Sequence, residues 1–145
     1  VGSGGGLPGI VIALLQPAVA VTCVDTVGKK AAFIRQAALE LHLPNLNAVH
    51  ARVEALVPGT EASERFSLIT ARAFSSLADL VEKTGHLLTP GGCWAAMKGK
   101  RPTDEIAGVA KQAEVFHVER LDVPMVNAER CLVWMRPHPS ATRDE

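Results

Sequence analysis

The chain has 145 residues, of which 48% are apolar and 21% charged, and this balance is that of an ordinary globular domain with one buried core. Its 15 basic residues offset 15 acidic ones, so bulk charge neither favours nor excludes a nucleic-acid partner, which only a clustering of charges could indicate. The most apolar stretch, residues 10–24, is interrupted by Gln16 and Pro17 and is too short to span a membrane.

Short apolar runs alternate with helical stretches along most of the chain. The chain begins inside what resembles a motif, so Val1 is expected to end a first strand whose preceding segment lies before it. Helices are predicted over residues 8–15, 28–41 and 77–88, and strands over residues 19–24, 47–50, 66–71 and 93–97. In the second helix the predicted buried face consists of Ile34, Ala37, Ala38 and Leu41. A further helix is expected to begin at Thr103, as its cap.

The last part of the chain departs from this alternation. Residues 115–123 and 130–135 follow each other with no helix-length segment between them, which predicts an antiparallel pair of strands. The whole pattern therefore predicts an α/β fold, a mostly parallel sheet with helices on both faces and a C-terminal antiparallel strand pair. We expect one catalytic domain over residues 1–136 and a flexible tail over residues 137–145.

A glycine-rich loop opens the chain, with six glycines among the first nine residues. Glycines after a strand allow a sharp turn and a close approach to a ligand, and the following helix presents unpaired N–H groups. Asp25 comes 19 residues after Gly6, at the predicted tip of the second strand, where a carboxylate can accept both ribose hydroxyls of a nucleoside. Together these features predict a nucleoside cofactor.

Two cofactors fit the glycine spacing. Gly4, Gly6 and Gly9 satisfy the GxGxxG pattern of nicotinamide enzymes, whereas Gly2, Gly4 and Gly6 satisfy the GxGxG pattern of methyltransferases. The Pro-Gly-Gly turn at residues 90–92, the terminal antiparallel pair and the lack of room for a substrate domain favour S-adenosylmethionine. An NAD(P)-dependent oxidoreductase is the alternative, and a binding module that has lost its activity is a third possibility.

Basic residues gather at the predicted carboxyl ends of the strands, the edge where such sheets bind ligands. They are Lys29, Lys30, Arg52, Arg72, Lys98, Lys100 and Arg101. This basic rim suits an RNA phosphate backbone. Aromatic residues are scarce, and Phe74 is the one well placed to touch a base, although a place in the core is at least as good an interpretation.

The chemistry-bearing side chains form no recognisable catalytic pair. The five histidines are scattered, and no catalytic residue is assigned. This pattern is compatible with methyl transfer to a ring nitrogen that carries a lone pair and no proton, for which no general base is required. Cys23, Cys93 and Cys131 lie far apart in apolar runs, so we expect buried, reduced thiols, no metal site and a cytoplasmic protein.

Several motifs resemble those of the glucose-inhibited division protein B family, the ribosomal RNA small subunit methyltransferases G. In chain order they are Val1-Gly2-Ser3-Gly4-Gly5-Gly6-Leu7-Pro8-Gly9, Asp25-Thr26-Val27-Gly28-Lys29-Lys30, Phe33-Ile34-Arg35-Gln36, Arg52-Val53-Glu54, Thr70-Ala71-Arg72-Ala73-Phe74, Met97-Lys98-Gly99 and Glu129-Arg130-Cys131-Leu132-Val133. The resemblance implies a Rossmann-like class I methyltransferase fold. It also implies methyl transfer from S-adenosylmethionine to N7 of a guanine, guanine 527, in the 530 loop of 16S rRNA, with the rRNA or the small subunit as partner and a monomer favoured.

The resemblance also implies site residues. The cofactor contacts carried over are Gly2, Ser3, Gly4, Gly6, Leu7, Asp25, Val53, Glu54 and Arg72. The positions expected to face RNA are Lys29, Lys30, Arg35, Lys98 and Arg130. The family's acidic residue before the glycine loop and its helical N-terminal segment have no counterpart in this sequence.

Overall fold

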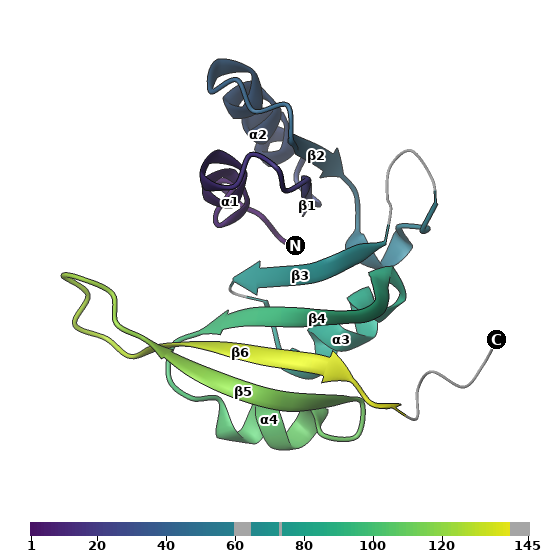
Figure 1. Cartoon of the computed structure of the whole chain (residues 1–145), viewed down its shortest axis with the longest axis vertical. Coiled ribbons are helices and arrows are strands. Elements are labelled where there is room, and N and C mark those ends of the chain that lie inside the picture. The colour runs from purple at the N-terminus through teal and green to yellow at the C-terminus, as the bar shows by residue number, and fades with distance from the viewer. Residues whose placement is uncertain (60–64, 73, 140–145) are drawn as a thin grey trace. The chain divides into compact units, whose positions relative to one another are not determined.

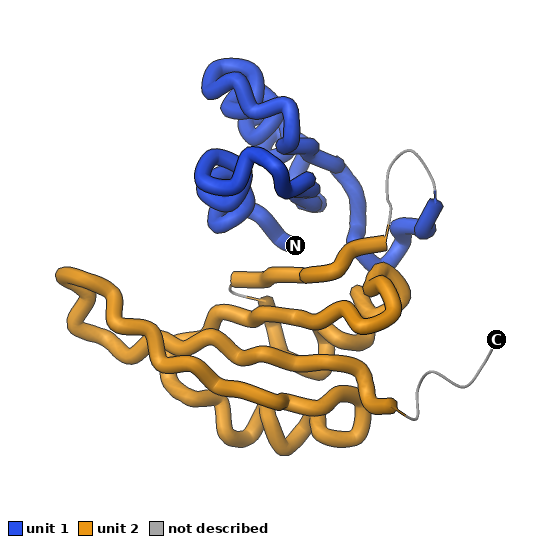
Figure 2. The backbone as a smooth tube through the Cα atoms, viewed as in Figure 1, with its two compact units in different colours: residues 1–63 blue, residues 64–145 orange. Residues whose placement is uncertain are grey.

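The computed structural model describes residues 1–59, 65–72 and 74–139. The chain divides into two compact units, residues 1–63 and residues 64–145, which are coloured separately in Figure 2. Each unit has its own sheet and its own buried residues.

Unit 1 is built on two parallel strands with helices packed against them (Figure 1). Its elements are α1 (Gly9–Leu15), β1 (Val21–Asp25), α2 (Gly28–Glu40), β2 (Leu46–His50) and a 3-10 turn, η1 (Val53–Ala55). Ala13 of α1 and Ile34 of α2 are fully buried in a cluster with Cys23 and Ala48 of the strands. Val1, expected at the end of a strand, lies in none, because the chain has already entered the glycine turns.

The predicted face of α2 is confirmed at Ile34 and wrong at Leu41. The helix ends at Glu40, and His42 adopts a positive φ of 53°, which turns the chain away from the helix axis. Leu41 is consequently exposed, and Leu43, two residues later, is buried in its place. The helical period alone does not predict that Leu43 is buried instead of Leu41, because this depends on the residue at which the helix ends.

Unit 2 is a four-stranded sheet in which the last strand lies in the middle. Its elements are β3 (Phe66–Arg72), α3 (Leu77–Thr84), a 3-10 turn η2 (Gly85–Leu87), β4 (Leu88–Lys98), α4 (Thr103–Val109), β5 (Ala113–Leu121) and β6 (Arg130–Pro137). The strand order is β3-β4-β6-β5, with β3 parallel to β4 and β6 antiparallel to both of its neighbours. This arrangement confirms the predicted α/β class and the C-terminal antiparallel pair.

Several predicted boundaries in unit 2 are wrong. The helix expected over residues 77–88 ends at Thr84, and β4 begins at Leu88 and includes the Pro-Gly-Gly segment. A break in the β3–β4 register accommodates that segment, and Gly92 permits it, because a Cβ there would lie 3.2 Å from the Phe66 carbonyl oxygen. Thr103 is the first residue of α4 rather than its cap, since Pro102 occupies the cap position.

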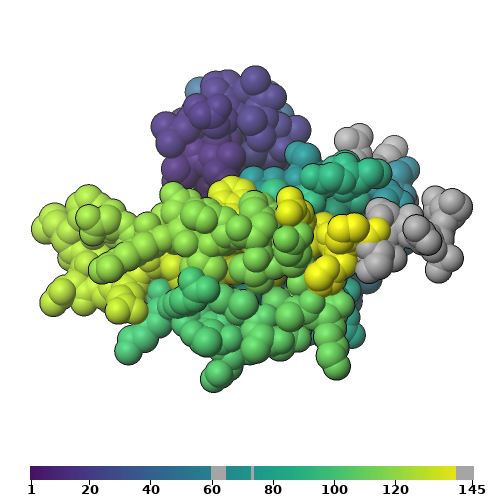
Figure 3. Space-filling view, turned by 60° about the horizontal axis from the view of Figure 1, so that its bottom comes forward, coloured from purple at the N-terminus to yellow at the C-terminus, as the bar shows by residue number. Residues whose placement is uncertain are grey.

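The C-terminal strand extends further than the sequence predicts. Pro137, expected to begin the tail, pairs with Ala113 as the last residue of β6, and a ring nitrogen of His138 lies 2.6 Å from the Ala110 carbonyl oxygen. Residues 140–145 of the expected tail lie outside the described residues. The connection between β5 and β6 extends beyond the rest of unit 2 in both the ribbon and the space-filling view (Figures 1 and 3).

A buried polar pair joins α3 to the sheet of unit 2. Trp94 Nε1 donates a hydrogen bond of 2.8 Å to Thr84 Oγ1, which in turn donates to the Leu80 carbonyl oxygen at 2.6 Å. Trp94 and Thr84 are 1% and 0% exposed, so water is not available to replace either bond.

We predict that Thr84→Val lowers the free energy of unfolding by about 1–3 kcal/mol, because the indole N–H of Trp94 is left buried without an acceptor. Thr84→Ser keeps the hydroxyl and is expected to lose about 1 kcal/mol for the missing methyl group. Urea unfolding followed by circular dichroism measures both values. A Thr84→Val protein as stable as the wild type contradicts the prediction.

Candidate functional site

The glycine-rich loop is a series of turns that leads into α1. Gly2, Gly4 and Gly6 have φ values of 60°, 53° and 91°, in the left-handed region that side chains with a Cβ rarely adopt. The Gly6 N–H donates to the Ser3 carbonyl oxygen at 2.8 Å and the Ile10 N–H donates to the Gly6 carbonyl oxygen at 2.7 Å. The alternating glycines of the predicted motif are therefore the residues that the backbone conformation requires.

Two glycines of the loop also lie where no side chain fits. A Cβ on Gly6 would lie 2.3 Å from Ile10 Cδ1 and 3.3 Å from Ile34 Cγ1, and a Cβ on Gly9 would lie 2.3 Å from Cys23 Sγ. In contrast, a Cβ on Gly4 or Gly5 would meet nothing within 4 Å. The inner side of the loop is thus packed against unit 1, whereas its outer side is open to a ligand.

Asp25, the last residue of β1, binds the glycine loop directly. Its Oδ2 accepts a hydrogen bond from the Gly4 N–H and its Oδ1 accepts one from the Val27 N–H, both at 2.8 Å. The residue is 6% exposed. Beside it, the Ser3 hydroxyl and N–H both donate to the Val24 carbonyl oxygen. The sequence predicted a ribose contact at Asp25 but not this role in shaping the loop.

The carboxyl end of β2 lies beside the same edge. His50 pairs in register with Asp25, and its Nε2 lies 3.0 Å from the Thr26 carbonyl oxygen. The Ala51 N–H donates to the Asp25 carbonyl oxygen at 3.0 Å. Val53 and Glu54 follow in η1, where Val53 is buried and Glu54 is exposed. In unit 1, the loop residues and Asp25 are bonded at the end of β1, and Val53 and Glu54 follow the adjacent end of β2; their role in a cofactor site stays a prediction.

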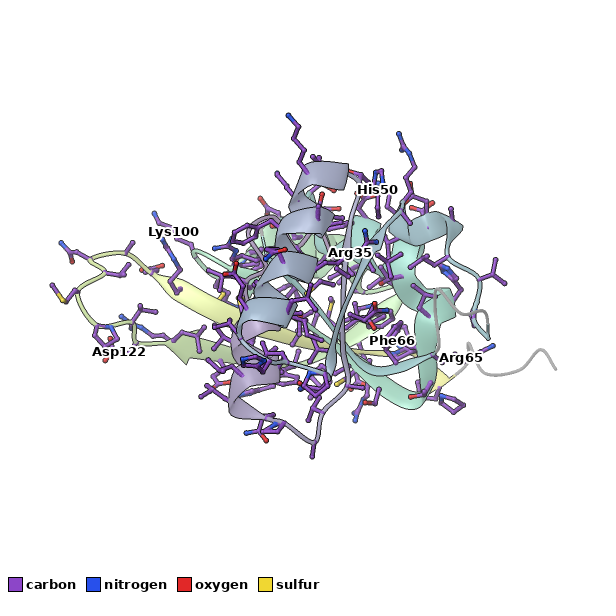
Figure 4. All side chains as sticks on the ribbon, turned by 90° about the horizontal axis from the view of Figure 1, so that it is seen from above. Arg35, His50, Arg65, Phe66, Lys100 and Asp122 are labelled. Atoms are coloured by element: carbon purple, nitrogen blue, oxygen red, sulfur yellow. The ribbon has the colours of Figure 1, made fainter. Side chains whose placement is uncertain are left out.

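The three basic residues predicted in α2 differ in their surroundings. Lys29 and Lys30 lie exposed in the first turn of the helix. Arg35, labelled with His50 in Figure 4, donates from Nε and Nη2 to the Ala48 carbonyl oxygen at 3.3 and 3.2 Å. Arg35 thus joins α2 to β2, while the two lysines are open to a partner.

The predicted residues of unit 2 lie at the carboxyl ends of β3 and β4. Arg72 ends β3, is exposed and pairs with Met97, one residue before Lys98. Phe74 is half-buried, with Lys83 Nζ 5.8 Å from its ring centroid. Ala73, between them in the motif, lies outside the described residues. The two strand ends are thus adjacent, as the parallel register requires.

The cations that follow β4 are of two kinds. Lys98 Nζ lies 2.8 Å from Glu105 Oε1, with the side chain only 14% exposed. Lys100 and Arg130 are exposed, and Lys100 stands clear of the sheet in Figure 4. The Arg130 guanidinium donates to the carbonyl oxygen of its neighbour Glu129 at 2.8 Å. Sequence reasoning missed Glu105, whose signal is an acidic residue in the first turn of the helix that follows Lys98.

The expected burial of the thiols is confirmed for Cys23 and Cys131, and Cys93 is half-buried. Burial raises the pKa of the Cys23 thiol above its ordinary value, a change that the Ser3 hydrogen bond partly opposes. Among the described residues, no group of three or more His, Cys, Asp or Glu side chains could hold a metal ion, and no helix is long and apolar enough to cross a membrane.

Comparison with known proteins identifies the family. The model of the family described as rRNA small subunit methyltransferase G matches residues 1–133. The chain belongs to this family. A relative with that name from Leptothrix cholodnii is 61% identical over 142 residues, and one from Polaromonas sp. is 58% identical over 136 residues. These alignments cover 98% and 94% of this chain but 63% and 58% of the relatives' own length.

Solved structures support the fold of this methyltransferase G family member. A glycopeptide N-methyltransferase in complex with S-adenosylhomocysteine superimposes with a TM-score of 0.77 at 11% identity, covering 94% of this chain and 79% of that one. TrmN from Thermus thermophilus gives a TM-score of 0.71 at 19% identity, covering 94% of this chain and 42% of that one. The Rossmann-like methyltransferase fold predicted from the sequence is therefore confirmed.

The glycine conformations alone do not separate the two cofactor patterns. Gly9 has the close helix–strand packing that the third glycine of GxGxxG provides, while Gly2, Gly4 and Gly6 have the positive φ values of the GxGxG turns. The central antiparallel β6 and the family match favour the methyltransferase pattern.

We predict that Gly6→Ala destabilises unit 1 by about 1–3 kcal/mol. The added Cβ would overlap Ile10, and the backbone at this position is left-handed, which disfavours any residue with a Cβ. Gly5→Ala is the matched control, since a Cβ there has open space and Gly5 is not at positive φ. Denaturant unfolding compares the two variants, and equal stabilities would show that the packing against Ile10 and Ile34 is unimportant.

Proposed function

We propose that the chain is the catalytic part of an S-adenosylmethionine-dependent methyltransferase that modifies N7 of a guanine in the 530 loop of 16S rRNA. The observation that carries this proposal is the family match over residues 1–133, which includes the glycine loop and Asp25. A ribosomal substrate also accounts for the expected cytoplasmic location. The chain spans about three fifths of its relatives' length, and the activity is proposed for the intact protein.

The residues of unit 1 fit the cofactor. Backbone at Gly2, Ser3, Gly4 and Gly6 and the exposed side chain of Leu7 would surround its amino-acid part, on the open side of the loop where a Cβ on Gly4 meets no protein atom. Asp25 uses one lone pair of each carboxylate oxygen for the backbone, which leaves capacity for the ribose hydroxyls. Glu54 and the main chain at Val53 would lie by the adenine, and Arg72 is a further contact proposed from the family.

The proposed reaction needs alignment rather than proton transfer. When bound, S-adenosylmethionine supplies an electrophilic methyl group on a sulfonium that leaves as a neutral thioether. Guanine N7 presents a lone pair and no proton, so no side chain has to act as a general base. Asp25 and the glycine loop would hold the methyl donor. Their contribution to the rate is the entropy of positioning.

The exposed cations would bind the rRNA phosphates. Lys29 and Lys30 are the best placed of the five predicted RNA contacts, because both are exposed beside the carboxyl end of β1. Arg130 is exposed as well. Arg35 and Lys98 are already bound within their units, so a phosphate would have to compete with the Ala48 carbonyl oxygen or with the Glu105 carboxylate.

Methyl transfer to small ribosomal subunits, with the modified base mapped, tests the proposal on the intact protein. We expect incorporation at one guanine of the 530 loop. Calorimetry with S-adenosylhomocysteine and with NAD distinguishes the alternatives. Binding of NAD alone would indicate an oxidoreductase, and binding of S-adenosylhomocysteine without methyl transfer to any ribosomal substrate would indicate an inactive binding module.

We predict that Asp25→Ala weakens S-adenosylhomocysteine binding and lowers stability together, because the Gly4 and Val27 N–H groups lose a buried charged acceptor. Each loss is expected to be about 1.5–3 kcal/mol. Asp122→Ala, at an exposed aspartate of the β5–β6 connection labelled in Figure 4, is the control and should change neither quantity. Undiminished cofactor affinity in folded Asp25→Ala protein would remove Asp25 from the proposed site.

We predict that the double variant Lys29→Ala/Lys30→Ala weakens rRNA binding and leaves cofactor affinity unchanged. Each phosphate that the variant no longer neutralises should reduce the slope of log K against log salt by roughly 0.7 to 0.9. Arg65→Ala/Lys111→Ala is the matched control, because it removes the same charge from exposed residues that precede β3 and β5, at the amino ends of these strands. Arg65 is labelled in Figure 4. Identical slopes for the two double variants would contradict an RNA contact at Lys29 and Lys30.

A further inference from the structure

Lys98, one of the predicted RNA contacts, is held inside unit 2. It is the last residue of β4, and its ammonium lies 2.8 Å from Glu105 Oε1 and 3.3 Å from the Phe74 carbonyl oxygen. The side chain is 14% exposed, and that of Glu105 is 32% exposed. A short, shielded pair of this kind is stronger than the exposed ion pairs of a protein surface. The Lys98 ammonium is therefore bound by the Glu105 carboxylate and the Phe74 carbonyl oxygen of its own unit.

Glu105 also binds the segment that follows Phe74, at the start of α3. Its Oε1 also accepts a hydrogen bond of 3.1 Å from the N–H of Leu77, the first residue of α3. That N–H is one of the groups that a helix leaves without an internal partner. Lys98 and Glu105 together thus hold both ends of residues 74–77, the segment between the carboxyl end of β3 and α3.

The position of this segment gives the pair its significance. It follows Arg72 at the carboxyl end of β3, the edge at which parallel sheets of this class bind their ligands. Phe74 is half-buried and is the aromatic residue of the segment. An aromatic ring whose main chain is fixed offers a base a stacking surface at little entropic cost.

We propose that Lys98 and Glu105 are positioning residues that fix residues 74–77 so that Phe74 presents its ring to the target guanine. This inference rests on the proposed function. It assigns Lys98 an internal role, and it leaves the phosphate contacts after β4 to exposed cations such as Lys100 and Arg101.

The two roles for Lys98 predict opposite effects of removing the Glu105 charge. If Lys98 contacts a phosphate, Glu105→Gln releases the ammonium, so rRNA binding tightens and its salt dependence steepens. If the pair is a positioning device, Glu105→Gln slows methyl transfer and leaves the salt slope unchanged. Glutamine keeps an acceptor for the Leu77 N–H, so the start of α3 is preserved. Asp104→Asn, an equal change of charge one residue earlier at an exposed position, is the matched control.

The experiment uses the intact protein with small ribosomal subunits and S-adenosylmethionine. We expect Lys98→Met and Glu105→Gln each to lower the single-turnover rate by about 10- to 100-fold, the effect of a small misplacement of reacting groups. The double variant should be no slower than either single variant, because both remove one interaction. Lys98→Arg should recover part of the rate, and Asp104→Asn should retain it. A steeper salt slope with an unchanged rate in Glu105→Gln would overturn the proposal.

Hydrogen exchange separates this inference from the proposed function. We expect the amides of residues 74–76 to exchange faster in Lys98→Met and Glu105→Gln than in the wild type and in Asp104→Asn. Unchanged exchange shows that the pair does not hold the segment, whatever the activity. A wild-type protein that transfers no methyl group to any ribosomal substrate overturns the proposed function and, with it, the assignment of Phe74 to a guanine.

Discussion

The candidate cofactor site depends on the buried carboxylate of Asp25. Glycines at positions 2, 4 and 6 make a left-handed backbone possible, but a glycine-rich segment has many other conformations of similar energy. The hydrogen bonds from the Gly4 and Val27 N–H groups to the two Asp25 oxygens select one of them. A bond between an amide and a charged acceptor is worth about 1.5–3 kcal/mol, which is enough to fix a loop of this length. The loop is thus shaped from the end of β1.

The sequence predicts well whatever depends on local spacing. The alternation of apolar runs with helical periods located the helices and strands, and the spacing of the glycines located the left-handed turns at Gly2, Gly4 and Gly6. The point at which a helix ends was not predicted in the same way. Because the chain turns at His42 with a positive φ, Leu43 is buried in the core and Leu41 is exposed. Likewise, the Pro-Gly-Gly segment is predicted as a turn from its sequence. Its place within β4 depends on the pairing with β3, in which Phe66 pairs with Leu88 and Leu68 pairs with Cys93.

The basic residues show most clearly what cannot be predicted from the sequence. A sequence gives the place of a charge along the chain but not the acceptor that the fold puts beside it. Arg35 and Lys98 were grouped in the sequence with Lys29, Lys30 and Arg130, yet Arg35 donates to the Ala48 carbonyl oxygen and Lys98 is paired with Glu105. Glu105 itself carries no signal other than its place in the first turn of α4. Partners that come from another element are set by tertiary packing, which local patterns do not contain.

In both units, a charged side chain at the end of a strand bonds to the main chain of another segment. In unit 1, the carboxylate of Asp25 at the end of β1 binds two backbone N–H groups, and in unit 2 the ammonium of Lys98 at the end of β4 binds a backbone carbonyl oxygen. In both places, a shielded charge holds the main chain of a segment that belongs to another part of its unit. In the proposed reaction, methyl transfer to a nitrogen that has no proton to lose would gain its rate from alignment, so residues that hold loops in place would carry the catalytic effect. On the proposed function, the side chains most important for the rate would be ones that neither donate nor accept a proton in the reaction.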